Sequence, residues 1–211
     1  MALSKLAANS FDLTDNYALT GTVTGAVSTQ KLFLIKNIDA SNSSTIDFVH
    51  GSNSVVFDST YKTYIVQIIN AHPDPNNGPN LGFQATTDGS NFNVTQTTTH
   101  FRARHDGDDG STTFGYDTGN DIAQGTTYQS LGSPGNGNSE CFTGQVIIFN
   151  PSSTTFIKNY FTVCSNFESG NIAQSVHNGG YFNTTSALTG ISFKFSAGNI
   201  GSGRFALYGI K

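Results

Sequence analysis

A short acidic segment holds the residues best suited to bind a metal ion. Asp106, Asp108 and Asp109 occur in the sequence DGDDGS, residues 106–111. Calcium prefers several oxygen ligands on a tight turn, and glycine permits such a turn. In an EF-hand loop, however, the glycine comes one position later and a glutamate closes the loop. We therefore expect either a calcium loop formed by these three aspartates or a plain polar turn, and no other cofactor.

Three histidines have the residue type for zinc but not the spacing. His100 and His105 are an odd number of positions apart, so within a strand they point to opposite faces. His72 is distant in the sequence, and no cysteine lies near any of the three. We expect no zinc site.

Hydrolytic chemistry has little support in the residue pattern. The chain has no G-x-S-x-G segment, and its only glutamates are Glu140 and Glu168. A polysaccharide depolymerase needs carboxylates clustered in a groove. The aspartates available for such a cluster are Asp106, Asp108, Asp109, Asp117 and Asp121. We expect that the protein is not an enzyme.

Tyrosines near predicted loops and strand ends offer a surface for binding sugars. Tyrosine has an apolar ring and a polar tip, which suits a platform for sugar rings as well as half-buried packing in a β-sandwich. Tryptophan, which sugar-binding platforms favour, is absent. Both interpretations apply to Tyr61, Tyr64, Tyr116, Tyr128 and Tyr181.

The segments that must position these residues look like short β-strands. Apolar and β-branched residues alternate with polar ones, and Gly, Asn, Asp and Ser interrupt the runs, whereas helical spacing is absent. This pattern predicts an all-β fold, an antiparallel β-sandwich or jelly roll. The expected strands are residues 17–23, 31–38, 45–50, 54–58, 63–69, 81–86, 100–104, 144–149, 155–164, 191–197 and 204–210.

The sequence indicates a single domain, because it contains no recognisable linker or internal repeat. We expect an N-terminal arm at residues 1–16 and one β-sandwich at 17–211. Three prolines at 70–80 predict a long exposed loop. Residues 105–140 are rich in glycine and predict a long loop insertion, with a set of short, loose strands as the alternative. Loops of such length usually cover a site or contact a partner.

Two cysteines, Cys141 and Cys164, flank a predicted hairpin. If residues 144–149 pair with 155–164, the centre of the hairpin falls between residues 152 and 153. The cysteines would then lie opposite each other, close enough for a disulfide. Folding in a cytoplasm favours free thiols. We expect free thiols, and a disulfide formed late is the alternative.

Charge and hydropathy exclude several classes of partner. Only 11% of residues are charged, the net charge is −4, and Ser, Thr and Asn make up about a third of the chain. No Lys/Arg stripe is available to neutralise phosphates, so we expect no nucleic-acid partner. No apolar run could cross a membrane, and the first residues are unlike a signal peptide, so we expect synthesis in a cytoplasm and no membrane contact.

Several segments resemble a family of virion proteins from tailed bacteriophages of marine and freshwater bacteria. The C-terminal segments LTGISF (188–193), SAGNIGSG (196–203) and LYGI (207–210) are similar to the closing hairpin of the family. The N-terminal segment DNYALTGTVTGA (15–26) is similar to its recurrent TGTVTGA opening. The central segments that follow the family's order are 56–64, 81–84 and 87–89, whereas residues 105–140 look particular to this chain.

This resemblance implies a jelly-roll fold of the concanavalin A-like type, in a protein made in the host cytoplasm and displayed on the phage particle, without catalytic residues. The expected function is a non-enzymatic virion component, either a head decoration (cement) protein or a tail-fibre protein. Its expected partners are further copies of itself, with a trimer as the first expectation, and other capsid or tail proteins. The alternative function is an adhesin that binds glycans on the host surface.

Overall fold

The structure, a computed structural model, describes residues 31–211, which form one compact unit from Lys31 to Lys211. The predicted arm at 1–16 and the predicted strand at 17–23 lie outside the described residues. Among residues 31–211, no helix is long and apolar enough to cross a membrane.

Twelve β-strands form the described part of the chain, as the sequence pattern predicts for an all-β fold. They are β1 (Leu32–Ser43), β2 (Ile46–Val49), β3 (Thr63–Asp74), β4 (Leu81–Thr86), β5 (Gln96–Asp106), β6 (Thr112–Tyr116), β7 (Gln129–Gly132), β8 (Phe142–Phe149), β9 (Lys158–Glu168), β10 (Ile172–Phe182), β11 (Gly190–Phe195) and β12 (Asn199–Ile210).

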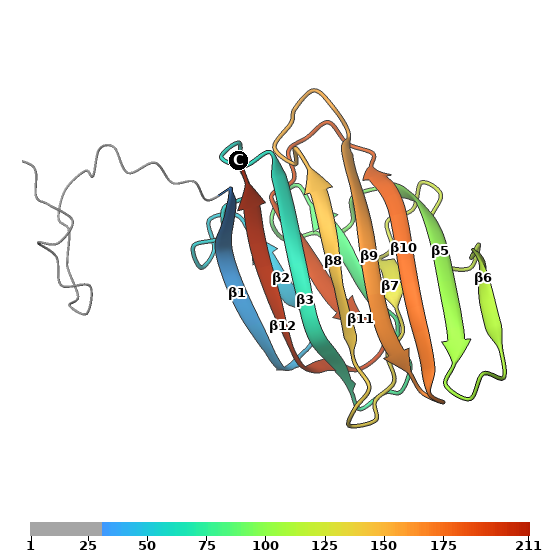
Figure 1. The fold of residues 1–211 in the computed structure, drawn as a ribbon. Helices are drawn as coiled ribbons and strands as arrows, with labels where there is room; N and C mark the ends of the chain where they lie inside the picture. Colours follow the sequence, from blue (N-terminus) through green and yellow to red (C-terminus); the bar gives the residue numbers. More distant parts are fainter. Residues whose placement is uncertain (1–30) are drawn as a thin grey trace, which may run out of the picture. The chain divides into compact units, whose positions relative to one another are not determined.

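The strands form two antiparallel sheets packed as a β-sandwich. The eight-stranded sheet has the order β1-β12-β3-β8-β9-β10-β5-β6, and the four-stranded sheet has the order β2-β11-β4-β7. In Figure 1 the large sheet faces the viewer and the small sheet lies behind it. One face of the large sheet therefore packs against the small sheet, and we call the opposite face the outer face.

The core fills the space between the sheets because alternate residues of each strand point inward, and many of these are apolar, such as Tyr64, Val66 and Ile68 of β3. Along β9 the residues alternate between buried and exposed from Lys158 to Ser165. At the centre, the Phe83 ring of the small sheet contacts two rings of the large sheet edge to face. Its centroid lies 5.0 Å from that of Tyr160 and 6.2 Å from that of Phe182.

Most predicted strands are present, but residues 54–58 are not a strand. Asn53 and Ser54 have positive φ angles, which an extended strand does not allow. The Val55 N–H donates to the Ser52 carbonyl, and the Phe57 N–H donates to Nδ1 of His50. The segment is a turn whose apolar side chains, Val55 and Phe57, point into the core.

The loop predicted at 70–80 is shorter than expected. β3 continues through His72 and Pro73 to Asp74, so the prediction is wrong for residues 70–74. Pairing with β12 is irregular here, with register shifts on either side of Ser202, which lets the strand accommodate a proline. The Nδ1 atom of His72 lies 2.8 Å from the Glu140 carbonyl oxygen, so the segment is also tied to a second part of the chain.

Three strands were absent from the sequence prediction. The longest, β10, lies between β9 and β5, and its inward positions include the buried polar side chains of Gln174 and Asn178. The other two, β6 and β7, lie inside the segment 105–140, for which short strands are the alternative to a loop insertion. β6 is exposed, whereas all four residues of β7 are buried.

The cysteines do not lie opposite each other. Gly144 is the partner of Cys164 in the β8–β9 hairpin, and Cys141 lies beyond Phe142, which pairs with Asn166. The register differs from the prediction because β9 begins only at Lys158, which places more of the connection on the β9 side. Both thiols are free, as expected, and the register of the hairpin does not place them opposite each other as the disulfide alternative requires.

Candidate functional site

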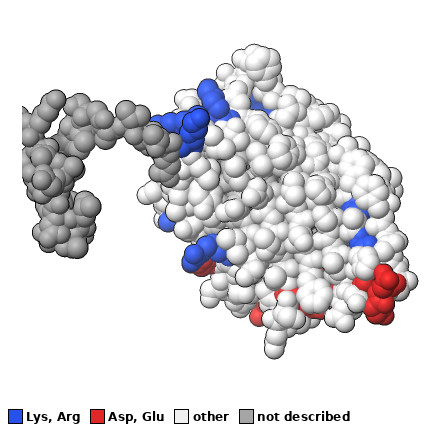
Figure 2. Space-filling view, viewed as in Figure 1, with Lys and Arg blue, Asp and Glu red and all other residues white. Residues whose placement is uncertain are grey.

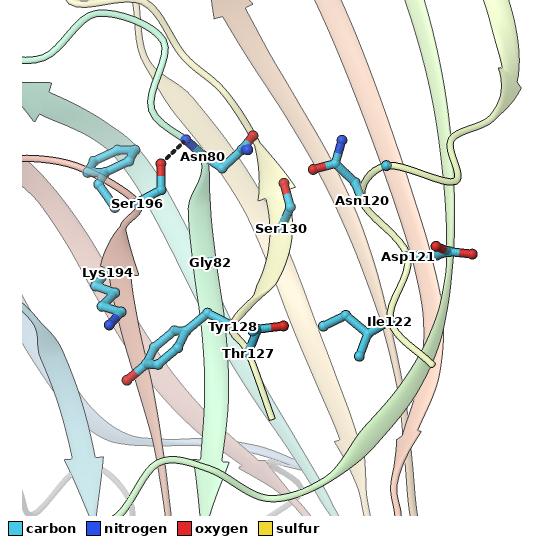
Figure 3. Close-up of a pocket in the computed structure, with 12 residues that line it drawn as sticks. Asn80, Gly82, Asn120, Asp121, Ile122, Thr127, Tyr128, Ser130, Lys194 and Ser196 are labelled. Carbon is cyan, nitrogen blue, oxygen red and sulfur yellow. Dashed lines mark hydrogen bonds between the residues drawn. The ribbon is translucent and has the colours of Figure 1, made fainter. Parts of the chain in front are cut away.

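A polar pocket lies on the outer side of the small sheet, over β4, β7 and the end of β11 (Figure 3). Its volume is about 190 Å³. One wall is the loop that follows β6 and leads into β7, so the segment 105–140 supplies more than half of the lining. The residues around the pocket are Asn80, Gly82, Gly119, Asn120, Asp121, Ile122, Thr127, Tyr128, Ser130, Lys194, Phe195 and Ser196.

Buried hydrogen bonds hold the loop wall in place. Gln129 points inward from β7, and its Nε2 donates to the Asn120 carbonyl over 2.9 Å. Thr98 of β5 donates to Oε1 of Gln129, and the Oγ1 atom of Thr98 also accepts the Ile122 N–H over 2.8 Å. Gln84 of β4 is fully buried and donates to the carbonyls of Thr126 and Thr127. The pocket therefore has a fixed shape without a ligand.

Tyr128 and Lys194 form one side of the pocket, where Figure 3 shows them next to each other. The Lys194 Nζ atom lies 4.3 Å from the centre of the Tyr128 ring, a cation–π contact. The Tyr128 hydroxyl donates to Oγ of Ser192 over 3.1 Å, and burial raises the pKa of this phenol. Gly82 permits this packing, since a Cβ atom at residue 82 would lie 2.9 Å from that of Tyr128.

Polar groups form the opposite side. The Asn80 N–H donates to Oγ of Ser196 over 3.0 Å. Ser130 is only 8% exposed, and its hydroxyl has no hydrogen-bond partner in the structure. Figure 3 shows this hydroxyl between the side chains of Asn80 and Asn120. An unpaired buried hydroxyl is unfavourable, so the pocket retains an unused hydrogen-bonding group.

The outer face of the large sheet is the second candidate surface. A row of directly paired apolar residues crosses five neighbouring strands of this face. The row consists of Leu34, Tyr208, Ile65, Ile147 and Phe161. Beside it lies an open hollow of about 480 Å³ with a mostly apolar lining that includes Ile69 and Val163.

This outer face carries very few charges. The outward positions of β8, β9 and β10 contain no Asp, Glu, Lys or Arg. Figure 2 shows this face in the same view as Figure 1, and the charged atoms lie near its margins. At one margin Asp39 and Arg204 form a two-pronged ion pair with distances of 2.7 and 3.0 Å.

The aspartates predicted as calcium ligands lie at the tip of the β5–β6 hairpin. The Asp109 N–H donates to the Asp106 carbonyl, and an Asp108 carboxylate oxygen accepts the Gly110 N–H over 3.3 Å. The Asp109 carboxylate lies 3.2 Å from Nε2 of His105. Within residues 31–211, no three acidic, histidine or cysteine side chains are placed to hold a metal ion. The calcium loop stays a prediction.

The histidines are separated as their spacing predicts. His100 is 1% exposed and points inward, whereas His105 on the same strand is exposed. Burial lowers the pKa of His100, although the nearby Asp117 carboxylate opposes this effect.

The five aspartates considered for hydrolysis do not share one groove. Asp106, Asp108 and Asp109 are at the hairpin tip, whereas Asp117 and Asp121 follow β6 at its other end. Burial alone would raise the pKa of Asp117, but hydrogen bonds from Asn120 and Gly119 and the charge of Arg102 hold it below its ordinary value. The Asp121 carboxylate accepts the Tyr116 hydroxyl over 2.7 Å.

The tyrosines proposed as a sugar platform have different environments. Tyr64 is 1% exposed and stacks on Phe57 at 4.6 Å, so for this residue the packing interpretation is confirmed and the platform interpretation is wrong. Tyr61 packs against the same core. Tyr116 is the most exposed, and Tyr181 is half-buried on β10. Only Tyr128 lines the polar pocket.

Sequence reasoning missed most of the other polar residues of the pocket, although it considered Asp121 as one of the aspartates for hydrolysis. Asn80, Ser130 and Lys194 come from segments far apart in the chain, and each residue type is ordinary in a sandwich rich in Ser and Asn. The usable signal was the length of the segment 105–140, which predicted that it covers a site or contacts a partner. Comparison with known proteins does not extend this assignment, because no family model, curated protein or solved structure matches the chain.

Proposed function

We propose that the chain is a non-enzymatic surface component of a tailed bacteriophage particle, a head decoration or tail-fibre protein that associates with further copies of itself. The observation that carries this proposal is the broad, nearly uncharged outer face of the eight-stranded sheet. The resemblance of the end segments to phage virion proteins supports a location on the phage particle. The same resemblance supports a jelly-roll topology of the concanavalin A-like type.

An uncharged face can be covered without removing ions from water, which is the costly part of burying a surface. The outer face also presents large apolar side chains next to one another: Phe149 and Phe161 have ring centroids 5.5 Å apart, and both are about 40% exposed. Adjacent exposed apolar groups of this kind mark interaction surfaces. A second copy of the same chain fits such a face, because two uncharged surfaces do not repel each other.

The remaining parts of the proposal follow from the resemblance and the composition. The protein is made in the host cytoplasm and is then assembled into the virion, where other capsid or tail proteins are its partners. The scattered aspartates of the described residues support a role without catalysis, because no groove brings them together.

Immunogold labelling of purified particles with antibody against the recombinant chain tests this function. Gold spaced over the head is expected for a decoration protein, and gold on the tail is expected for a fibre. Particles without label would contradict the proposal, and an enzymatic function as a polysaccharide depolymerase would then have to be tested.

The second candidate function is an adhesin that binds glycans on the host surface, and the pocket at Tyr128 favours it. If the protein is an adhesin, the labelled chain is expected to bind cells of the bacterium on which the particle grows. Soluble sugar is expected to compete with this binding. Cells that stay unlabelled would exclude the adhesin but leave the structural role intact.

A further inference from the structure

We propose that the pocket of Asn80, Tyr128, Ser130 and Lys194 binds one ring of an uncharged sugar. This inference rests on the second candidate function and names its binding site and ligand class. It depends on the geometry of the small sheet and not on the outer face of the large one.

The first argument is the unused hydrogen-bonding capacity of the pocket. Ser130 is more than nine-tenths buried, faces the pocket from β7, and has no partner for its hydroxyl. Buried polar groups in folded proteins nearly always have a partner, so an unpaired one requires a reason. A sugar hydroxyl can both donate and accept, and it can therefore pair with Ser130 in either direction.

The second argument is that the walls mix polar and apolar groups as a sugar ring does. A sugar ring has hydroxyls around its edge and C–H groups on its faces. The Asn80 amide and the amide oxygen of Asn120 can serve the hydroxyls, while Ile122, Phe195 and the ring of Tyr128 offer apolar contact.

The charges of the pocket point to a neutral ligand. Lys194 is the single cation of the lining and Asp121 the single anion, so the two formal charges cancel. Lys194 already lies over the Tyr128 ring, and Asp121 already accepts a hydroxyl from Tyr116. Neither charge is thus left alone to attract an ion of opposite sign.

The size of the pocket limits the ligand to a single ring. Its volume of about 190 Å³ is below the range of roughly 300–1,000 Å³ that holds drug-sized ligands. Because Gln129, Thr98 and Gln84 hold the walls, little conformational freedom is lost when the ring enters.

A weak but measurable affinity is expected. A hexose has about 12 non-hydrogen atoms, and ordinary ligand efficiency then gives a dissociation constant of roughly 1 mM. Many copies on one particle would convert such weak contacts into firm attachment through avidity.

Nuclear magnetic resonance titration of the full ¹⁵N-labelled chain tests the proposal. The probes are D-glucose, D-galactose, D-mannose and N-acetyl-D-glucosamine, with the anionic N-acetylneuraminate for comparison. At least one neutral sugar is expected to cause saturable shifts in the amides of Tyr128, Ser130 and Lys194.

Two variants and a matched control locate the site. Ser130→Ala and Asn80→Ala each remove one hydrogen-bonding group, and each is expected to weaken binding roughly fivefold. Ser139→Ala removes an exposed serine that lines a different hollow, and it is expected to leave binding unchanged. The dispersion of each spectrum shows whether the variant has folded.

The outcomes separate this inference from the adhesin function. If none of the neutral sugars saturates, if only N-acetylneuraminate does, or if Ser130→Ala binds as tightly as the unmodified chain, the pocket assignment is wrong. Sugar-competed binding to host cells under the same conditions would keep the adhesin and place its site elsewhere. Saturation at the pocket without any cell binding would support the site and exclude the adhesin.

Discussion

At the scale of single residues, burial gives the two thiols very different reactivity. Cys164 lies in the core and is 2% exposed, and burial raises its pKa to about 12. Cys141 is half-buried and donates to Oδ1 of Asn70 over 3.7 Å. Because the thiolate is the reactive form, an aromatic disulfide reagent at neutral pH is expected to titrate one thiol in the folded protein and two after denaturation. Two fast thiols in the folded protein would contradict the placement of Cys164.

The inward histidine predicts a loss of stability in mild acid. Burial lowers the pKa of His100 below its ordinary 6.5, so between its folded pKa and 6.5 the unfolded chain binds more protons than the folded one. The free energy of unfolding therefore falls as the pH drops below 6.5. Urea unfolding midpoints measured from about pH 7.5 to about pH 5 should fall more steeply for the unmodified protein than for His100→Gln. Equal slopes would show that His100 does not contribute.

At the scale of elements, one glycine lies where the pairing of β12 with β3 shifts register. Gly203 has a φ of +129°, and a Cβ atom there would lie 2.7 Å from the Cα atom of Ala71. Gly203→Ala is thus expected to lower the free energy of unfolding by at least about 1–3 kcal/mol. The positive φ angle disfavours any residue with a Cβ atom, and that atom would collide with Ala71.

Gly115 provides the matched control for this change. It lies in β6, its φ is not positive, and a Cβ atom there would have no neighbour within 4 Å. Gly115→Ala should leave the denaturant midpoint nearly unchanged. Equal denaturant midpoints for the two alanine variants would mean that the backbone at residue 203 tolerates a side chain.

Predictability from sequence also differs between elements. β4 has the predicted bounds, and β8 and β9 follow from their alternation of apolar and polar residues. The sequence pattern does not predict β10, because Gln174 and Asn178 occupy inward positions at which apolar residues are expected. Their burial becomes favourable only through distant partners, such as the Ser130 carbonyl, which accepts from Asn178.

The candidate pocket could not be predicted for the same reason. Its fixed wall depends on Gln129 and Thr98, which are far apart in sequence and meet only in the folded chain. Of its lining, Tyr128 is predicted only as one of five tyrosines near loops and strand ends, and Asp121 only as one of five scattered aspartates.

At the scale of the whole molecule, the outer face should control association. Phe161 and Val163 are 41% and 46% exposed at neighbouring outward positions of β9. Replacing both with lysine would place two charges inside the proposed contact, where burying them is costly. We expect the dissociation constant of the oligomer to rise at least about 100-fold in sedimentation equilibrium.

Thr185→Lys is the control for this experiment. Thr185 is exposed in the connection between β10 and β11, outside the strands of the outer face. The Thr185→Lys variant adds a lysine without altering the outer face, and it should leave the oligomer intact. An assembly that survives the double lysine change would mean that copies meet through another surface.

The position of β12 has a consequence for synthesis. This strand lies between β1 and β3, and Leu32 pairs with Ile210, so β1 cannot join the large sheet until residues 199–210 have left the ribosome. Pairings over such sequence distances form slowly, and the apolar edge of β3 stays uncovered meanwhile. A nonsense mutation within the codons for residues 199–210 should therefore be as harmful to the protein as one near the start of the fold.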